Sequence, residues 1–135
     1  MIAGLSIHHV GYLVRDMANS RERFRELGYV EESPLYDDVL RKVDILFLLK
    51  DGYRIELVSP NHETSVVHDL MGKVGDSPYH LCYEAPDFDS RILALKASGY
   101  LLADPPAPAV ALDGRRVAFL YRTGVGLIEL LEVAP

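Results

Sequence analysis

The stretch Gly126-Leu127-Ile128-Glu129-Leu130-Leu131-Glu132-Val133 decides the fold, because it has the pattern of a buried strand with a carboxylate in its middle. A continuous apolar run of this length is typical of a strand that is covered on both faces. An unpaired carboxylate buried there would be strongly destabilising, so Glu129 needs a positive partner. The same pattern occurs in Tyr53-Arg54-Ile55-Glu56-Leu57-Val58. The sequence therefore predicts two Ile-Glu-Leu strands whose glutamates face one divalent metal ion.

An internal repeat relates these two strands. A shift of 73 residues superposes Ile55-Glu56-Leu57 on Ile128-Glu129-Leu130. A shift of 71 residues superposes five further identical pairs, which are His9 and His80, Tyr12 and Tyr83, Asp16 and Asp87, Gly28 and Gly99, and Tyr29 and Tyr100. Self-similarity at a fixed offset indicates duplication of one supersecondary unit.

Each half of the chain has the pattern of a strand, a helix and three strands. The first half predicts strands at about 6–14, 29–31, 42–49 and 53–58 and a helix at 17–27; the second predicts strands at 79–85, 100–103, 116–121 and 127–133 and a helix at 87–97. The polar connection between the halves contains a short predicted helix at 66–71. Residues 105–108, with three prolines, predict a rigid loop, because proline is unfavourable in a central strand. We expect one domain over 1–135, with modules at about 1–60 and 78–135 and a linker at 61–77.

Composition narrows the class of protein. The chain has 135 residues, of which 49% are hydrophobic and 25% charged, as in ordinary globular proteins. No apolar run approaches the roughly 20 residues that span a bilayer, and no secretory signal is visible, so a cytoplasmic location is expected. One cysteine, Cys82, excludes an internal disulfide and fits a reducing compartment. The net charge of −6 disfavours general nucleic-acid binding.

Strand alternation brings the repeated polar residues to one face. Ile55 and Leu57 flank Glu56 and should pack under the helices, as should the equivalent residues beside Glu129, while the glutamates face the other side. His9 and His80 follow the same alternation. Two imidazoles and two carboxylates would carry a formal charge of −2, which balances a divalent cation. Mixed imidazole and carboxylate ligation suits Zn, Ni, Co, Mn or Fe.

The other histidines and the cysteine have weaker cases as ligands. His8 falls on Tyr79 in the 71-residue register, so His9 is the expected ligand. His62 and His68 lie in the linker without repeat partners, which favours surface positions. Cys82 shares the face of His80 and is expected either to line the pocket or to be a small buried apolar residue.

The chain resembles the vicinal oxygen chelate (glyoxalase/bleomycin resistance/dioxygenase) superfamily, and within it the methylmalonyl-CoA epimerase family. The matching stretches are His8-His9-Val10-Gly11, Ile55-Glu56-Leu57-Val58-Ser59-Pro60, Tyr79-His80-Leu81, and Gly114-Arg115-Arg116-Val117-Ala118-Phe119-Leu120 leading to Leu127-Ile128-Glu129-Leu130. The resemblance implies an α+β fold in which two βαβββ modules form a curved eight-stranded mixed sheet around a metal-binding cleft. It implies that His9, Glu56, His80 and Glu129 bind one divalent metal ion, and that the protein is a homodimer.

The implied reaction is proton abstraction α to a thioester carbonyl through a metal-stabilised enediolate, as in an epimerase or isomerase. Glu129 would be one acid/base group. The glutamate that serves as the other in the epimerases matches a place near Leu40, and Asp38, two residues earlier, is the candidate substitute, although Asp37 and Asp38 also suit a turn.

Alternatives to an epimerase remain open. The His-Glu-His-Glu set also resembles a glyoxalase I-type lyase or isomerase, a single base would suit a one-base isomerase or a lyase, and a metal-free small-molecule-binding protein of the resistance type has the same fold. The expected substrate is a small molecule, with an acyl-CoA as one candidate. The pairs Arg41-Lys42 and Arg115-Arg116 are compatible with a coenzyme A phosphate or with solvated strand ends.

Overall fold

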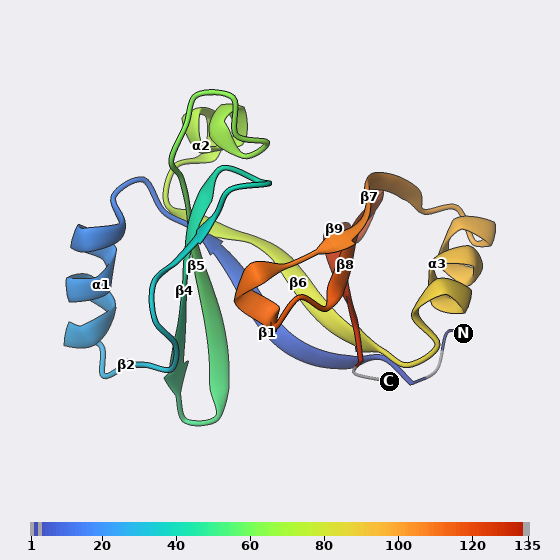
Figure 1. Ribbon diagram of the computed structural model, residues 1–135, viewed down its shortest axis with the longest axis horizontal. Coiled ribbons are helices and arrows are strands. Elements are labelled where there is room, and N and C mark those ends of the chain that lie inside the picture. The colour runs from blue at the N-terminus through green and yellow to red at the C-terminus, as the bar shows by residue number, and fades with distance from the viewer. Residues whose placement is uncertain (1, 3, 134–135) are drawn as a thin grey trace. The chain divides into compact units, whose positions relative to one another are not determined.

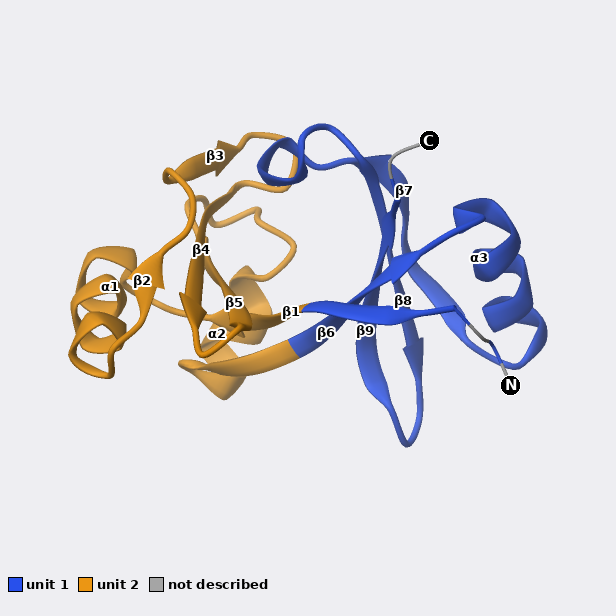
Figure 2. Ribbon diagram, turned by 90° about the horizontal axis from the view of Figure 1, so that it is seen from below, with its two compact units in different colours: residues 1–8, 80–135 blue, residues 9–79 orange. Residues whose placement is uncertain are grey.

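The computed structural model describes residue 2 and residues 4–133, and the chain divides into two compact units (Figure 2). Unit 1 comprises Met1–His8 and His80–Pro135, and unit 2 comprises His9–Tyr79. Strand β1 (Ser6–Leu13) begins in unit 1 and continues in unit 2. Each unit contains most of one copy of the predicted repeat.

In unit 2 the strand order is β2-β4-β5-β1, and a short strand, β3, also pairs with β4. The elements after β1 are α1 (Met17–Glu26), β2 (Val30–Glu31), β3 (Tyr36–Asp38), β4 (Val43–Lys50), β5 (Tyr53–Pro60) and α2 (His68–Val74). Strands β4 and β5 form an antiparallel hairpin, whereas β1 and β5 are parallel. The hairpin turns at Asp51-Gly52, and both residues have positive φ angles.

In unit 1 the strand order is β6-β9-β8-β7. The elements are β6 (Ser77–Ala85), α3 (Phe88–Ala97), β7 (Leu101–Pro108), a short 3-10 helix (Val110–Leu112), β8 (Arg116–Arg122) and β9 (Gly126–Glu132). Strands β6 and β9 are parallel, and the other pairs are antiparallel. The predicted α+β fold of two βαβββ modules with mixed strand pairing is confirmed. The described residues form nine strands rather than eight, because β3 adds one.

Each module has its own apolar core between the sheet and one long helix. Helix α1 lies beside its strands in unit 2 and α3 beside its strands in unit 1 (Figure 1). The cluster in unit 2 is Val14, Met17, Leu46, Leu48 and Leu57, and the cluster in unit 1 is Ala85, Phe88, Ile92, Leu95, Ala118, Leu120, Ile128 and Leu130. The residues that flank each repeated glutamate therefore pack under the helices, as predicted.

The repeated glycines end the two long helices. Gly28 and Gly99 have φ angles of 95° and 106°, which are unfavourable for residues with a Cβ atom. Each follows the helix C-cap and donates its amide to a carbonyl of the last turn, and the next residue, Tyr29 or Tyr100, donates back to Phe24 or Leu95. This is the Schellman arrangement in both modules. No helix in the described part of the chain is long and apolar enough to span a membrane.

The repeated aspartates do not have the same role. Asp16 has an extended backbone and accepts a hydrogen bond from the amide of Asn19 at 3.1 Å, so it is the N-cap of α1. Asp87 occupies the cap position of α3 in the left-handed conformation, and its side chain makes no capping hydrogen bond. Sequence identity at this pair therefore does not preserve the capping interaction.

The prediction of a loop at 105–108 was wrong, because β7 continues through these residues to Pro108. Among the described strands β7 pairs only with β8, so one edge of it needs no ladder hydrogen bonds. The register shifts twice, between Leu102 and Asp104 and between Asp104 and Ala107. Edge strands with bulges tolerate proline, which explains why the sequence rule failed here.

We expect Leu130→Ala to lower the free energy of unfolding by about 2–5 kcal/mol, because Leu130 is fully buried between β9 and α3. The matched control is Leu93→Ala, whose side chain is 66% exposed and whose loss should change that free energy by less than about 0.5 kcal/mol. Chemical denaturation of both variants measures the difference. Equal losses would contradict the assignment of the unit 1 core.

Candidate metal centre

In unit 2, His9 and Glu56 form a buried pair. His9 lies in β1 and Glu56 in the neighbouring parallel strand β5, where Glu56 is in register with Gly11. Their exposed fractions are 1% and 5%. The distance between His9 Nε2 and Glu56 Oε1 is 3.4 Å. The Glu56 side chain therefore points, as predicted, to the sheet face opposite the one that packs under α1.

In unit 1, His80 and Glu129 repeat this arrangement. His80 lies in β6 and Glu129 in the parallel strand β9, where Glu129 is in register with Cys82. Both residues are 4% exposed, and the distance between His80 Nε2 and Glu129 Oε1 is 3.2 Å. The duplication inferred from the sequence therefore extends to the local geometry of the polar pairs.

The chemistry of each pair fits a divalent cation. Neutral imidazole nitrogen and carboxylate oxygen are common ligands of first-row divalent ions. With bonds of about 2.0–2.2 Å, adjacent ligands lie about 2.8–3.1 Å apart around an octahedral ion and about 3.3–3.6 Å apart around a tetrahedral ion. The separations of 3.4 Å and 3.2 Å fall within the range that these two geometries span. Each of the four residues offers one ligand atom, and all four are buried.

Two phenylalanines complete the pairs, and the sequence analysis missed them. Phe47 of β4 is directly opposite Glu56, and Phe119 of β8 is directly opposite Glu129. The Phe47 and His9 rings meet edge-to-face, with 5.4 Å between their centroids. The Phe119 and His80 rings meet in the same way, with 5.3 Å between their centroids. The two positions differ by 72 residues, between the registers of 71 and 73. The repeat spacing could therefore have identified these two phenylalanines. They were missed because apolar residues in predicted strands are usually core residues.

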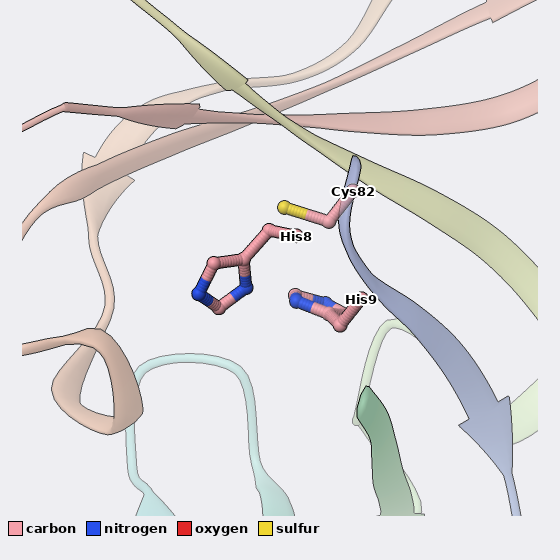
Figure 3. A group of neighbouring side chains, drawn as sticks. All are labelled: His8, His9 and Cys82. Atoms are coloured by element: carbon pink, nitrogen blue, oxygen red, sulfur yellow. The ribbon is translucent and has the colours of Figure 1, made fainter. Parts of the chain in front are cut away.

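The remaining histidines and Cys82 are placed largely as expected. His62 and His68 are exposed, and His62 Nδ1 lies 2.8 Å from Thr64 Oγ1. His8 is half-buried, whereas Cys82 is fully buried. Within unit 1, the potential ligand atoms of His8 and Cys82 lie within 4.8 Å of each other. Figure 3 shows their side chains together with that of His9.

Asp38 has the contacts of a turn residue. It is 2% exposed and ends β3. Its Oδ1 accepts the backbone amide of Arg41 at 3.0 Å, and its Oδ2 accepts the guanidinium of Arg41 at 2.9 Å. Leu40, near the place of the expected glutamate, is 65% exposed in the same turn. Both carboxylate oxygens of Asp38 are thus engaged by Arg41 within the turn. The role of Asp38 as a second acid/base group stays a prediction.

The basic pairs engage neighbouring protein groups. Arg116 binds the carboxylates of Asp89 and Glu132 and lies over the Phe88 ring. These hydrogen bonds, to Glu132 first and then to Asp89, raise the pKa of Arg116, and the bonds from Arg116 lower the pKa of Glu132. Arg115 donates to the carbonyl of Leu112. In the other pair, Arg41 binds Asp38, and the Lys42 ammonium donates to the Thr64 hydroxyl.

The sequence of this protein matches the model of the Glyoxalase/Bleomycin resistance protein/Dioxygenase superfamily over residues 8–119. The chain belongs to this superfamily. The resemblance stated from the sequence is therefore confirmed at the level of the superfamily, and the two βαβββ modules are its fold.

Members of the superfamily similar to this chain include methylmalonyl-CoA epimerases. The mitochondrial enzyme of Dictyostelium discoideum is 23% identical over 129 residues, which cover 93% of this chain and 77% of that protein. The crystal structure of the Mycobacterium tuberculosis epimerase is 26% identical, with a TM-score of 0.84 over 100% of this chain and 94% of that one. A Streptomyces coelicolor epimerase variant in complex with 2-nitronate-propionyl-CoA is 23% identical, with a TM-score of 0.82 over 98% and 100% of the two chains. At 23% identity this last likeness shows the fold alone.

The Arg116–Glu132 contact predicts a pH dependence of stability. Because the folded-state pKa of Glu132 is lowered, its contribution is present above the unfolded pKa and is lost as the pH falls through the folded pKa. We expect the stability difference between the natural protein and Glu132→Gln to shrink as the pH falls below the ordinary glutamate value of about 4.3. Urea denaturation across this range measures it. A difference that grows on acidification would contradict the pairing.

Proposed function

We propose that the protein is a divalent-metal-dependent epimerase or isomerase that acts on an acyl thioester, as methylmalonyl-CoA epimerases do. The observation that carries the proposal is the occurrence of a buried His–Glu pair at repeat-related positions in both modules. Membership of the superfamily and the likeness to methylmalonyl-CoA epimerases support the reaction class.

In this proposal His9, Glu56, His80 and Glu129 together hold one ion. Two neutral imidazoles and two carboxylates compensate its charge, and four protein ligands leave two positions of an octahedral shell open for oxygens of a substrate. The donor set suits Co, Mn, Ni, Zn or Fe. When bound, the ion supplies Lewis-acid stabilisation of the negative charge that develops on the substrate oxygens.

The proton is moved by carboxylates of the chain. Glu129 is our candidate base: one of its oxygens accepts the proton from the carbon α to the thioester carbonyl, and the electron pair of the C–H bond moves toward the carbonyl oxygen. Epimerisation then requires protonation of the opposite face by a second group. Asp38 is the candidate from the sequence, and its release from Arg41 is the condition for that role.

The substrate is proposed by class. An acyl-CoA ester fits the reaction, because the thioester carbonyl acidifies the neighbouring C–H bond. The contacts of Arg41, Lys42 and Arg116 would have to exchange for contacts with coenzyme A phosphates if these residues bind them. Such exchange is inexpensive for the partly exposed pairs of Arg116, since exposed ion pairs contribute about 0–1 kcal/mol each, whereas the Arg41–Asp38 pair is largely buried. A cytoplasmic location and a homodimer stay predictions.

Metal binding distinguishes this function from a metal-free binding protein of the same fold. We expect Co²⁺ to bind protein purified without chelators and to raise its melting temperature. Glu56→Gln and Glu129→Gln should each weaken binding by at least about 10-fold, because each removes an anionic ligand of nearly the same shape.

The matched control for these variants is Glu63→Gln, an exposed glutamate of the linker that should leave Co²⁺ binding unchanged. Isothermal titration calorimetry measures the Co²⁺ dissociation constant of the natural protein and of the three glutamine variants. Absence of Co²⁺ and Mn²⁺ binding to the natural protein would favour the metal-free alternative.

Hydrogen–deuterium exchange at the α-carbon tests the reaction. We expect the metal-loaded protein to exchange this proton of an acyl-CoA ester such as methylmalonyl-CoA in D₂O, followed by mass spectrometry. Glu129→Gln should slow exchange by at least about 100-fold, since a general base of this kind contributes about 10²–10⁴. Asp38→Asn should retain one-sided exchange but lose inversion if Asp38 is the second group. Exchange in no acyl-CoA ester, with turnover of a hemithioacetal, would reassign the protein to the glyoxalase I type.

A further inference from the structure

Phe47 and Phe119 lie on the sheet face that carries the His–Glu pairs, and not on the face that packs under the helices. On β4, the residues on either side of Phe47, Leu46 and Leu48, belong to the cluster under α1. On β8, the neighbours Ala118 and Leu120 belong to the cluster under α3. Because side chains alternate along a strand, each phenylalanine points to the face opposite that of its helix-covered neighbours. That face carries the His–Glu pair.

Each phenylalanine neighbours both members of its pair. Side chains directly opposite on antiparallel strands have Cβ atoms about 4.5–5.5 Å apart, so each phenylalanine is a cross-strand neighbour of its glutamate. The same ring meets the imidazole edge-to-face, with interplanar angles of 73° at His9 and 87° at His80. One aromatic ring therefore restrains the imidazole while flanking the carboxylate.

This restraint matters because the imidazole torsion is soft. The χ2 angle of histidine has a broad distribution, and rotation about it would move Nε2 away from the glutamate oxygen. An edge-to-face aromatic contact contributes about 0.5–1.5 kcal/mol beyond simple burial. That energy corresponds to a preference of about 2- to 10-fold for the restrained orientation.

The two phenylalanines differ in exposure. Phe47 is 4% exposed, so protein atoms surround it. Phe119 is only half-buried, although it holds the equivalent position. Since its neighbours on β8 pack under α3, the exposed part of Phe119 lies on the face of His80 and Glu129. An apolar ring beside a candidate base is suited to contact the acyl group of a thioester.

We infer that Phe47 and Phe119 are a repeat-related pair of positioning residues that orient His9 and His80 toward the metal ion, and that Phe119 also contacts the acyl group of the substrate. The inference rests on the proposed function. It assigns a metal-affinity role to two residues that would otherwise count as apolar packing, and a specificity role to one of them.

The test compares Phe47→Leu and Phe119→Leu, which keep an apolar side chain but remove the ring edge. Phe24→Leu is the matched control, because Phe24 also makes edge-to-face contacts, at 5.2 Å to Tyr12 and to Tyr29, on the α1 side of unit 2. Phe119→Tyr keeps the ring at the half-buried position. The readouts are the Co²⁺ dissociation constant by calorimetry, the visible absorption spectrum of bound Co²⁺ and the melting temperature.

We expect both site variants to weaken Co²⁺ binding by about 2- to 10-fold and to change the Co²⁺ spectrum. Phe24→Leu should lower the melting temperature but leave the Co²⁺ affinity and spectrum unchanged. Phe119→Tyr should bind Co²⁺ with the affinity of the natural protein. With saturating Co²⁺, Phe119→Leu should raise KM for the acyl-CoA ester, and Phe47→Leu should not.

Unchanged Co²⁺ affinity and spectrum in both leucine variants, while the natural protein binds Co²⁺, would overturn the positioning role and leave the proposed function intact. An unchanged KM in Phe119→Leu would overturn the substrate contact. Failure of the natural protein to bind Co²⁺ would instead overturn the proposed function and this inference together.

Discussion

The contact between a buried imidazole and a buried carboxylate, made once in each module, is the interaction on which the account depends. A carboxylate inside a sheet is destabilising unless it is hydrogen-bonded, paired or bound to a metal. Glu56 and Glu129 are 5% and 4% exposed, and each has a histidine Nε2 within 3.4 Å. In the function that we propose, a divalent cation compensates these carboxylates, which would explain why polar side chains occupy this face of each module.

Strand register maintains the separation between the apolar and polar faces. Ile128 and Leu130 pack under α3, while Glu129 between them faces His80 and Phe119. A slip of one residue would exchange these faces, placing the carboxylate in the core. The hydrophobic packing under each helix therefore fixes the face on which each His–Glu pair lies. Duplication repeats this constraint, so that both halves keep the same histidine, glutamate and phenylalanine.

Sequence analysis predicted the features that depend on periodicity and repetition. The modules and the faces of Glu56 and Glu129 follow from local patterns and were confirmed. Residues 105–108 were predicted wrongly, because only the sheet topology shows that β7 is an edge strand where proline is tolerated. The contacts of Asp38 with Arg41 are local, three residues apart in one turn, and agree with the turn alternative for Asp37 and Asp38. The contact of Phe47 with His9 is tertiary, so alternation indicated a face but not a partner.

X-ray absorption spectroscopy at the cobalt edge, on Co²⁺-loaded protein of known stoichiometry, tests the central claim most directly. We expect one ion per chain with two imidazoles and further oxygen ligands in its shell, since His9 and His80 would share a single ion. Two ions per chain with one imidazole each, or a shell without imidazole, would contradict the claim that the repeated pairs form one centre.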